Sequence, residues 1–394
     1  MPRQSEHLPL IRNIATLAGL DARRKKAEVV GDFLLYFQSF SPPSMSFSSS
    51  SSSSSAAARL AVTLGHLAPQ HASFGTADCA AAALTTQQPA KGNKLKYTHD
   101  IASTILTREQ RRFYEDNGFL LVKKLIDPSV LNEIKDHFVA LCNGEKERFS
   151  TTTVMRDVTL AKQKGLKGER AVTKVQDFQD DPDLFRYCQL PEVLKYVQCF
   201  TGPNIRTIHT MLINKPPDVG PTGRHPLHQD LVYFPMEPAN RICCSWTAME
   251  PVTRANGCLV VLPGTHKGEL LEHGYPEWEG GVNKAYHGIK SAQQEKGDLV
   301  YLEMEPGDTV FFHPILIHGS GANKTSGYRK AISGHYASAG ECSYIDVTGG
   351  PREELAREIE EMAKAKLRTD EHIKIQDIWR MKSRLVQGED VTLI

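Results

Sequence analysis

The sequence lacks the features that would place it at once in a disulfide-rich, membrane or nucleic-acid-binding class. Its eight cysteines contain no Cys-x-x-Cys pair and no closely spaced framework, which argues against a zinc ribbon or a secreted disulfide scaffold and favours a reducing, intracellular compartment. No segment reaches the roughly 18 uncharged apolar residues of a membrane span. The net charge of +1 provides no basic field for nucleic acid. We therefore expect a soluble protein with no membrane span and no nucleic-acid partner.

Residues 1–90 differ in composition from the rest of the chain. Residues 48–55 are an unbroken serine tract that runs into three alanines, and such a segment cannot bury enough apolar area to offset its conformational entropy. The length of 394 residues allows two average domains as well as one large domain with an appended leader. We predict the second arrangement, with a disordered leader over residues 1–90 and a catalytic domain over residues 91–394.

The segment after residue 91 opens with helical signals. Thr107 and Gln110 form a capping box for a helix that Gly118 ends, and the apolar run 119–126 that follows predicts a strand. Apolar residues at helical spacing predict further helices over residues 128–141, 191–200 and 353–367. The last of these is the last clear element of the chain.

Between residues 205 and 345 the pattern changes to short strands. Segments rich in β-branched and aromatic residues alternate there with Pro, Gly and Asn turns. The expected strands include residues 207–213, 242–249, 258–262, 309–312 and 331–337. Many short strands with helices ahead of them indicate a mainly β fold with flanking helices, either a sandwich or a barrel, of which the jelly roll is one solution.

His228 and Asp230 form the only His-x-Asp triplet of the chain. In an extended segment, residues i and i+2 point to the same side, so the two side chains can hold one ion. A chain with fifteen histidines is expected to contain about one such triplet by chance. The triplet alone is therefore a weak signal.

His318 strengthens it, because this histidine ends an apolar segment and is followed by glycine. Two imidazoles and one carboxylate on one face of an ion leave three positions open, as Fe(II) requires to bind both a chelating co-substrate and O2. Zinc favours a closed or four-coordinate site and cannot activate O2. We predict that His228, Asp230 and His318 hold iron.

Arg329 follows His318 by eleven positions and can form a bidentate pair with the far carboxylate of a dicarboxylate co-substrate. Taken alone, a strand histidine is more often structural and an arginine is usually a solvated surface charge. Taken together and in this order, the His228-x-Asp230 triplet, His318 and Arg329 form the pattern of 2-oxoglutarate oxygenases. A structural or ligand-supporting role is expected for the other histidines of the strand region, His209, His225, His313 and His335.

Longer matches extend this resemblance over most of the chain from about Arg59. They comprise residues 172–178, 210–217, 225–230, 257–266 and 311–321. In these stretches the sequence resembles the phytanoyl-CoA dioxygenase family. The resemblance implies a double-stranded β-helix (jelly-roll, cupin-like) fold and an enzyme that hydroxylates C2 of a 3-methyl-branched acyl-CoA in fatty-acid α-oxidation. It also implies Fe(II), 2-oxoglutarate and O2, with ascorbate as the reductant and with release of succinate and CO2.

The resemblance further implies which residues contact 2-oxoglutarate. They are Lys174, Met211, Trp246, Ser320 and Arg329. Without the resemblance, Lys174 is interpreted as a surface lysine in a loop before a helix, and Met211 and Trp246 as core residues. A coenzyme A phosphate would attract cations, for which Lys162, Lys164 and Lys167 are candidates, although most such charge runs are only solvated.

Residues 59–67 have the form of an N-terminal peroxisomal signal, Arg-Leu, five residues, then His-Leu. On a helix, Leu60, Leu64 and Leu67 would share one face, which an import receptor could bind. The plainer alternative is a chance match in an alanine-rich linker. We expect a peroxisomal matrix enzyme, and initiation at Met45 would place the signal near the start of the product.

Two other functions stay open at this point. The chain could be a related oxygenase that acts on a free acid or a secondary metabolite. It could also be a catalytically silent binding protein on the same barrel, because fold does not fix function. The intact His228, Asp230 and His318 set, together with Arg329, argues against the second alternative.

Overall fold

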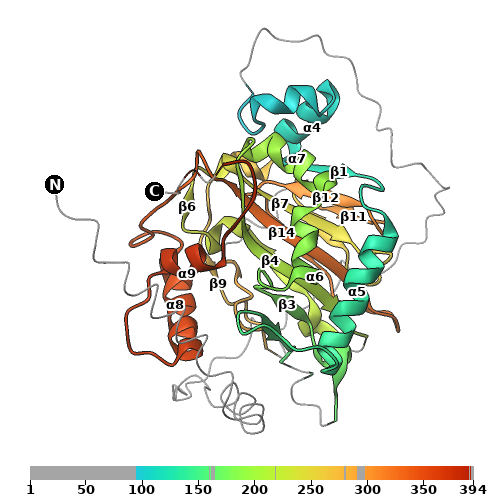
Figure 1. Cartoon of the computed structure of the whole chain (residues 1–394). Coiled ribbons are helices and arrows are strands. Elements are labelled where there is room, and N and C mark those ends of the chain that lie inside the picture. The colour runs from blue at the N-terminus through green and yellow to red at the C-terminus, as the bar shows by residue number, and fades with distance from the viewer. Residues whose placement is uncertain are drawn as a thin grey trace, which may run out of the picture. The chain divides into compact units, whose positions relative to one another are not determined.

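Two antiparallel β-sheets form the framework of the molecule (Figure 1). The larger sheet has the strand order β1-β12-β7-β14-β4-β3-β2, with β16 paired to β4, and the smaller has the order β11-β8-β13-β5. The larger sheet consists of β1 (Phe119–Val122), β2 (Thr153–Met155), β3 (Lys174–Gln176), β4 (Ile205–Lys215), β7 (Ile242–Ala248), β12 (Thr309–Phe312), β14 (Arg329–Ser338) and β16 (Arg384–Gln387). The smaller consists of β5 (His225–His228), β8 (Leu259–Val261), β11 (Val300–Leu302) and β13 (His318–Ser320).

The chain passes repeatedly from one sheet to the other. In chain order β4, β7, β12 and β14 enter the larger sheet, while β5, β8, β11 and β13 enter the smaller. Eight antiparallel strands divided in this way between two sheets form a jelly roll, the double-stranded β-helix expected from the sequence. Buried residues of both sheets, among them Cys244, Leu259, Val261 and Phe312, pack into one cluster between them.

The structure, a computed structural model, describes residues 95–158, 160, 165–217, 219–278, 281–290, 298–389 and 391. These residues belong to the compact unit Asn93–Ile394. The predicted leader, its targeting signal, Met45 and the candidate lysines 162 and 164 lie outside the described residues. The seven cysteines in the described part are all free thiols. No helix in that part is long and apolar enough to cross a membrane.

Helices from the first third of the domain cover the outer face of the larger sheet (Figure 1). The Thr107–Gln110 capping box is present at α4 (Arg108–Asn117), which Gly118 ends with a φ of 81°. Two longer helices follow, α5 (Pro128–Asn143) and α7 (Pro191–Thr201), each with proline in its first turn. Their buried residues Phe138 and Phe200 join a core cluster with Phe311 of the sheet. These helices and their boundaries agree with the sequence prediction.

The C-terminal region contains more structure than the sequence pattern indicated. The helix α8 (Glu353–Leu367) has the predicted bounds, but it is not the last element. A second helix, α9 (Ile375–Lys382), packs on α8 and on β4, and β16 then adds a strand to the larger sheet. Ile378 and Trp379 of α9 join Leu355 and Ile359 of α8 in one apolar cluster. This cluster closes one end of the barrel.

Candidate active site

Strand pairing brings the three predicted iron ligands together. His228 at the end of β5 lies directly opposite His318 at the start of β13, and their ring centroids are 4.2 Å apart. Asp230 follows after one extended residue, with its Oδ1 3.3 Å from His228 Nε2 and 3.6 Å from His318 Nε2. All three side chains are buried, so one ion could bind to all of them within a protected site.

Backbone carbonyls fix the tautomers of both histidines. His228 Nδ1 lies 2.9 Å from the oxygen of Pro226, and His318 Nδ1 lies 2.9 Å from the oxygen of Leu316. A carbonyl can only accept a hydrogen bond, so each Nδ1 carries the proton and each Nε2 lone pair is directed at the shared space. Burial lowers the pKa of His318 to about 4, although Asp230 opposes this shift. His318 is therefore neutral at pH 7, as a metal ligand must be.

Asp230 is held ionised and oriented by a third histidine. His335 on β14 donates from Nε2 to Asp230 Oδ2 over 2.9 Å. Burial opposes ionisation of Asp230, but the hydrogen bond from His335 helps to outweigh it, and the pKa of this carboxyl lies well below its usual range. Oδ2 is thus occupied by His335, whereas Oδ1 faces the two other ligand candidates. His335 has the ligand-supporting position that the sequence allowed as one of two interpretations.

Cys244 also lies within ligand distance of Asp230 and His335. Burial raises the pKa of its thiol well above the usual range. A protonated thiol is a poor ligand, and His335 already donates its Nε2 proton to Asp230. The set of His228, Asp230 and His318 is therefore the better candidate for iron.

Gln229 anchors the segment between the two first ligands. Its side chain donates to the carbonyls of Glu269 and Ile315, both over 3.0 Å, and accepts from Leu271 N over 2.8 Å. Its backbone N–H donates to His273 Nε2 over 3.0 Å. Because Gln229 points away from its two neighbours, these bonds fix the backbone that directs His228 and Asp230 to the same side. No local sequence pattern indicated this role.

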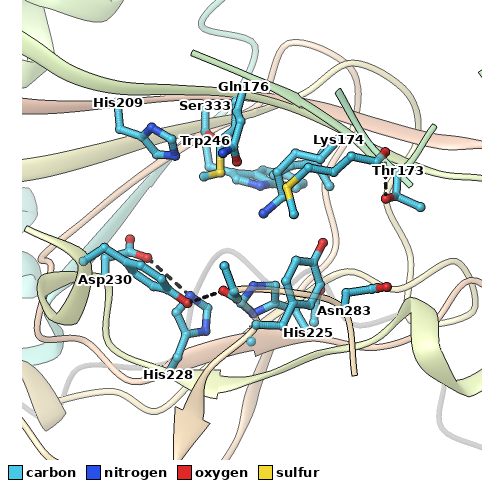
Figure 2. Close-up of a pocket in the computed structure, with 18 of the residues that line it drawn as sticks. Thr173, Lys174, Gln176, His209, His225, His228, Asp230, Trp246, Asn283 and Ser333 are labelled. Atoms are coloured by element: carbon cyan, nitrogen blue, oxygen red, sulfur yellow. Dashed lines mark hydrogen bonds and ion pairs between the residues drawn. The ribbon is translucent and has the colours of Figure 1, made fainter. Parts of the chain in front are cut away.

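One cavity contains the ligand candidates (Figure 2), and its wall includes residues of the barrel strands as well as of α8 and α9. Figure 2 shows Lys174, Trp246 and Ser333 on one side of this space, and His225, His228 and Asp230 on the other. We call its two ends the anchor end and the helix end. The anchor end contains Lys174, Lys215, Trp246, Ser320 and Arg329. The helix end contains Phe234, Ile359, Met362, Trp379 and Lys382.

Arg329 lies in the anchor end of the cavity and is the largest fully buried side chain among the described residues. Its Nη2 donates to the carbonyl of Gly257 over 3.0 Å, whereas Nε and Nη1 have no hydrogen-bond partner in the described structure. A Cβ at Gly257 would lie 2.4 Å from the oxygen of Gly321, and the φ of Gly257 is 86°, so only glycine fits there. Buried unpaired N–H groups are costly unless a ligand accepts from them. Arg329 is thus prepared for a carboxylate.

Lys174 is not a surface lysine in a loop, as its local sequence suggested. It lies in β3, paired with Ile213, and is 8% exposed. Its ammonium sits 4.6 Å from the ring centroid of Tyr286 and has no hydrogen-bond or ion-pair partner among the described residues. Burial lowers the pKa of Lys174 to about 8, against the opposing effects of Asp230 and Asp177. Figure 2 shows its nitrogen directed into the cavity.

The other residues that the resemblance assigned to 2-oxoglutarate also line this cavity. They are Met211 on β4, Trp246 on β7 and Ser320 on β13. The guanidinium carbon of Arg329 lies 5.6 Å from the ring centroid of Trp246. Met211 and Trp246 therefore combine packing with a surface towards the cavity, which local sequence cannot distinguish from core packing alone.

Two anchor-end contributors had no signal in the sequence. Lys215 ends β4, and its ammonium donates to the carbonyls of Gly223 and Gly321 over 2.6 Å each. Burial and the charges of Arg329 and Lys174 lower the pKa of Lys215 well below its usual range. Tyr286 covers Lys174 from a segment with little regular structure. Only the fold brings these residues to the cavity.

The remaining strand histidines separate into two groups. His225 and His209 line the cavity, with the His225 ring 4.2 Å from that of His228 and His209 Nδ1 3.4 Å from Asp177 Oδ1. His313 lies elsewhere, against Asn240 and the ring of His266, and is structural.

Comparison with known sequences decides the family. The model described as Phytanoyl-CoA dioxygenase (PhyH) matches residues 114–331, more than half of the chain. The chain belongs to the phytanoyl-CoA dioxygenase family. It is 51% identical over 337 residues to the peroxisomal phytanoyl-CoA dioxygenase of Homo sapiens, which covers 85% of this chain and 98% of the human protein. It is 53% identical over 302 residues to the probable phytanoyl-CoA dioxygenase of Caenorhabditis elegans, which covers 74% of this chain and 96% of that protein.

The site suits the Fe(II) and 2-oxoglutarate on which this dioxygenase depends. Two imidazole nitrogens and one carboxylate oxygen are the donor set of non-haem iron oxygenases. The unpaired guanidinium N–H groups of Arg329 suit one end of a dicarboxylate. Both features open onto the same cavity, so the chain's own residues match the cofactor and the co-substrate.

Proposed function

We propose that this phytanoyl-CoA dioxygenase family member hydroxylates C2 of a 3-methyl-branched acyl-CoA, such as phytanoyl-CoA, with 2-oxoglutarate and O2 as co-substrates. His228, Asp230 and His318 would hold Fe(II), and Arg329 would hold the far carboxylate of 2-oxoglutarate. Succinate and CO2 are released with the hydroxylated thioester. The observation that carries the proposal is the buried, partly unpaired Arg329 in the same cavity as the three ligand candidates.

The protein's contribution is geometry, charge and exclusion of water. Bound iron, with 2-oxoglutarate and O2, supplies the oxidising chemistry that breaks a C–H bond. His335 keeps Asp230 ionised, and the carbonyls behind His228 and His318 keep both Nε2 atoms deprotonated. At the anchor end Lys174 and Arg329 add positive charge for a dianionic co-substrate, and Trp246 and Met211 limit the space that it can occupy.

Substrate-dependent formation of succinate by the purified protein tests this proposal. With Fe(II) and 2-oxoglutarate, phytanoyl-CoA should yield succinate and 2-hydroxyphytanoyl-CoA in equal amounts, and phytanic acid should yield much less. Equal turnover of the free acid would favour an oxygenase of free acids. Turnover of neither compound, with 2-oxoglutarate still bound, would favour an oxygenase of another metabolite. Failure to bind iron and 2-oxoglutarate would favour a silent binding protein.

We place the enzyme in the peroxisome, in keeping with the name of its human relative. We propose further that it acts in the matrix and that an import receptor binds the signal at residues 59–67. The support for this is the sequence pattern, with Arg59-Leu60 and His66-Leu67 at the required spacing. Imaging of Met1 and Met45 products with a C-terminal tag tests it. Import that is unchanged by Leu60→Arg would contradict it.

A further inference from the structure

The helix end of the cavity is a continuous apolar path that starts beside Asp230. Phe234 packs on His335, with ring centroids 5.2 Å apart, and Trp379 packs on Phe234 at the same distance. Ile359 and Met362 of α8 continue the lining next to Trp379. The charged residue of the helix end, Lys382, is paired with Asp177 over 3.0 Å. Its apolar lining suits the aliphatic parts of a bound substrate.

The apolar path ends at a cation on the same helix. Ile359, Met362 and Lys366 are spaced by three and four residues, so they share one face of α8. The Lys366 ammonium donates to the carbonyl of Thr151 over 2.9 Å and to Thr153 Oγ1 over 3.0 Å. It has no carboxylate partner among the described residues. The apolar strip of α8 therefore leads from the cavity to an unneutralised positive charge.

Lys382 is linked to Lys366 through Thr153 and Asp177, because Thr153 Oγ1 lies 3.0 Å from Lys366 Nζ and 3.2 Å from Asp177 Oδ2, and Asp177 Oδ1 lies 3.0 Å from Lys382 Nζ. Arg148 and Arg156 flank the segment that holds Thr151 and Thr153, the two residues to which Lys366 donates. Partial burial and the charges of Lys382 and Arg148 lower the pKa of Lys366, although Asp177 opposes them. Arg148 is in turn close to Arg156, which follows the cavity residue Met155, and partial burial and Arg156 lower the pKa of Arg148. We call Arg148, Arg156, Lys366 and Lys382 the cation cluster.

The carboxylates in this region are already paired. Asp177 Oδ1 lies 3.0 Å from Lys382 Nζ, and Asp180 Oδ1 lies 2.6 Å from Arg384 Nη2. Within the described residues, Arg148, Arg156 and Lys366 consequently have no ion-pair partner. Like charges gathered without counter-charges cost free energy, which a bound anion would relieve. Arg156 and Lys366 adjoin Met155 and Met362, which line the cavity.

We propose that the cation cluster binds the phosphates of coenzyme A and that its pantetheine arm lies along Ile359, Met362 and Trp379. This inference rests on the proposed function and identifies the phosphate-bearing part of its substrate. It differs from the expectation that Lys167 and its neighbours hold the phosphates. In the proposed arrangement the pantetheine arm follows the α8 strip and presents the thioester and C2 to His228, Asp230 and His318, while the phosphates stay at the protein surface.

Charge-neutralising variants of the cation cluster test the inference. Lys366→Gln keeps a donor for Thr151 and Thr153, and Arg148→Gln touches no internal ion pair, so neither should disturb the fold. Calorimetric titration with free coenzyme A should show a Kd raised about threefold to tenfold by each variant and further by the pair. Lys195→Gln, an exposed lysine on α7, removes the same charge elsewhere and should have no effect. An unchanged Kd in the double variant would overturn the proposal.

A substrate without phosphates distinguishes the loss of phosphate binding from a loss of packing in the double variant. Phytanoyl-pantetheine has the same thioester and acyl chain but lacks the pyrophosphate and the 3′-phosphate. The double variant should raise the KM for phytanoyl-CoA without changing its kcat, and should leave the KM for phytanoyl-pantetheine unchanged. Equal effects on both thioesters would assign the two residues to packing and sink the phosphate site.

Two further outcomes are distinguishable. If Lys167→Gln, rather than Lys366→Gln, weakens coenzyme A binding, the phosphates bind at the earlier loop and the cluster is wrong. If the wild-type protein hydroxylates neither thioester, the proposed function fails. Hydroxylation of both thioesters with the same KM in wild type and double variant would leave that function intact and remove only the phosphate site.

Discussion

The two ends of the cavity are built by different elements and from different chemistry. The anchor end lies among β-strands of the barrel and contains buried cations, Lys174, Lys215 and Arg329. The helix end is closed by α8 and α9 and is largely apolar, with Phe234, Ile359, Met362 and Trp379. Strands hold charged groups at fixed positions because neighbouring strands fix the backbone on both sides. The two helices add side chains to the cavity wall from outside the sheets, and their buried residues share one core cluster with Ile208 of β4 and Ala337 of β14.

The largest effect on activity is expected from variants of the iron-ligand candidates, which lie where the two ends of the cavity meet. His228→Ala or His318→Ala should abolish iron binding and lower turnover by about 10³-fold or more, because each removes one of only three protein bonds to the metal. Asp230→Ala should behave in the same way. Iron content after reconstitution and succinate release measure the two effects. Near-normal turnover in either histidine variant would move the metal site elsewhere.

At the anchor end, Arg329→Ala should raise the 2-oxoglutarate concentration needed for half-maximal rate by about 10²-fold, since two charge-assisted hydrogen bonds are lost. The KM for the acyl-CoA should hardly change. Arg329→Lys should recover only part of the affinity, because an ammonium cannot form the bidentate pair. Kinetics against 2-oxoglutarate for both variants are the measurement. A 2-oxoglutarate dependence like that of wild type in both would show that another residue anchors the co-substrate.

His335→Ala should weaken iron binding by about tenfold, as expected for loss of the group that orients a metal-binding carboxylate. The loss should be smaller than that in the ligand variants because Asp230 itself remains. His335→Gln can still donate to Asp230 Oδ2 and should restore much of the affinity. Metal titration of the apoprotein compares the three forms. An effect as large as that of Asp230→Ala would instead make His335 a ligand.

The pH dependence of co-substrate binding distinguishes two anchor-end cations. The Lys174 ammonium, with a pKa of about 8, loses its proton as the pH rises from 7 to 9, while Arg329, with a pKa of about 10, stays charged. The KM for 2-oxoglutarate should therefore rise over this range, by up to about tenfold. Lys174→Arg should flatten the profile, because arginine stays protonated. A falling KM with rising pH in the wild-type enzyme would contradict this assignment.

The smallest effect is expected at the helix end. Met362→Ala removes apolar area from the α8 strip and should raise the KM for phytanoyl-CoA about threefold to tenfold. It should leave the 2-oxoglutarate dependence unchanged, in contrast to the Arg329 variants. Equal changes in the KM for phytanoyl-CoA and in the 2-oxoglutarate dependence would mean that the two ends of the cavity are not independent. Exposed Leu367→Ala on the same helix is a matched control.

Much of the candidate site could be predicted because its signals are local or lie in fixed order. The His-x-Asp triplet, the later His318 and Arg329 name four residues that the structure brings to one cavity. The predicted helix over residues 353–367 agrees with α8 because its apolar spacing is regular. Lys174 was misjudged from local sequence because β3 has only three residues, too few to show an alternating pattern. α9 was missed because its eight residues are a short helix without a side-chain cap.

The sequence by itself determined the strand and helix types, the order of the ligand candidates and the family resemblance, because these depend on side-chain chemistry and spacing along the chain. Only the tertiary structure decided that His228 lies opposite His318, that His335 supports Asp230, and that Lys366 donates to the carbonyl of Thr151. Each of these contacts joins residues distant in sequence, and strand register and helix packing set them. No local sequence pattern encodes strand register or helix packing, because both depend on burial of the whole core at once.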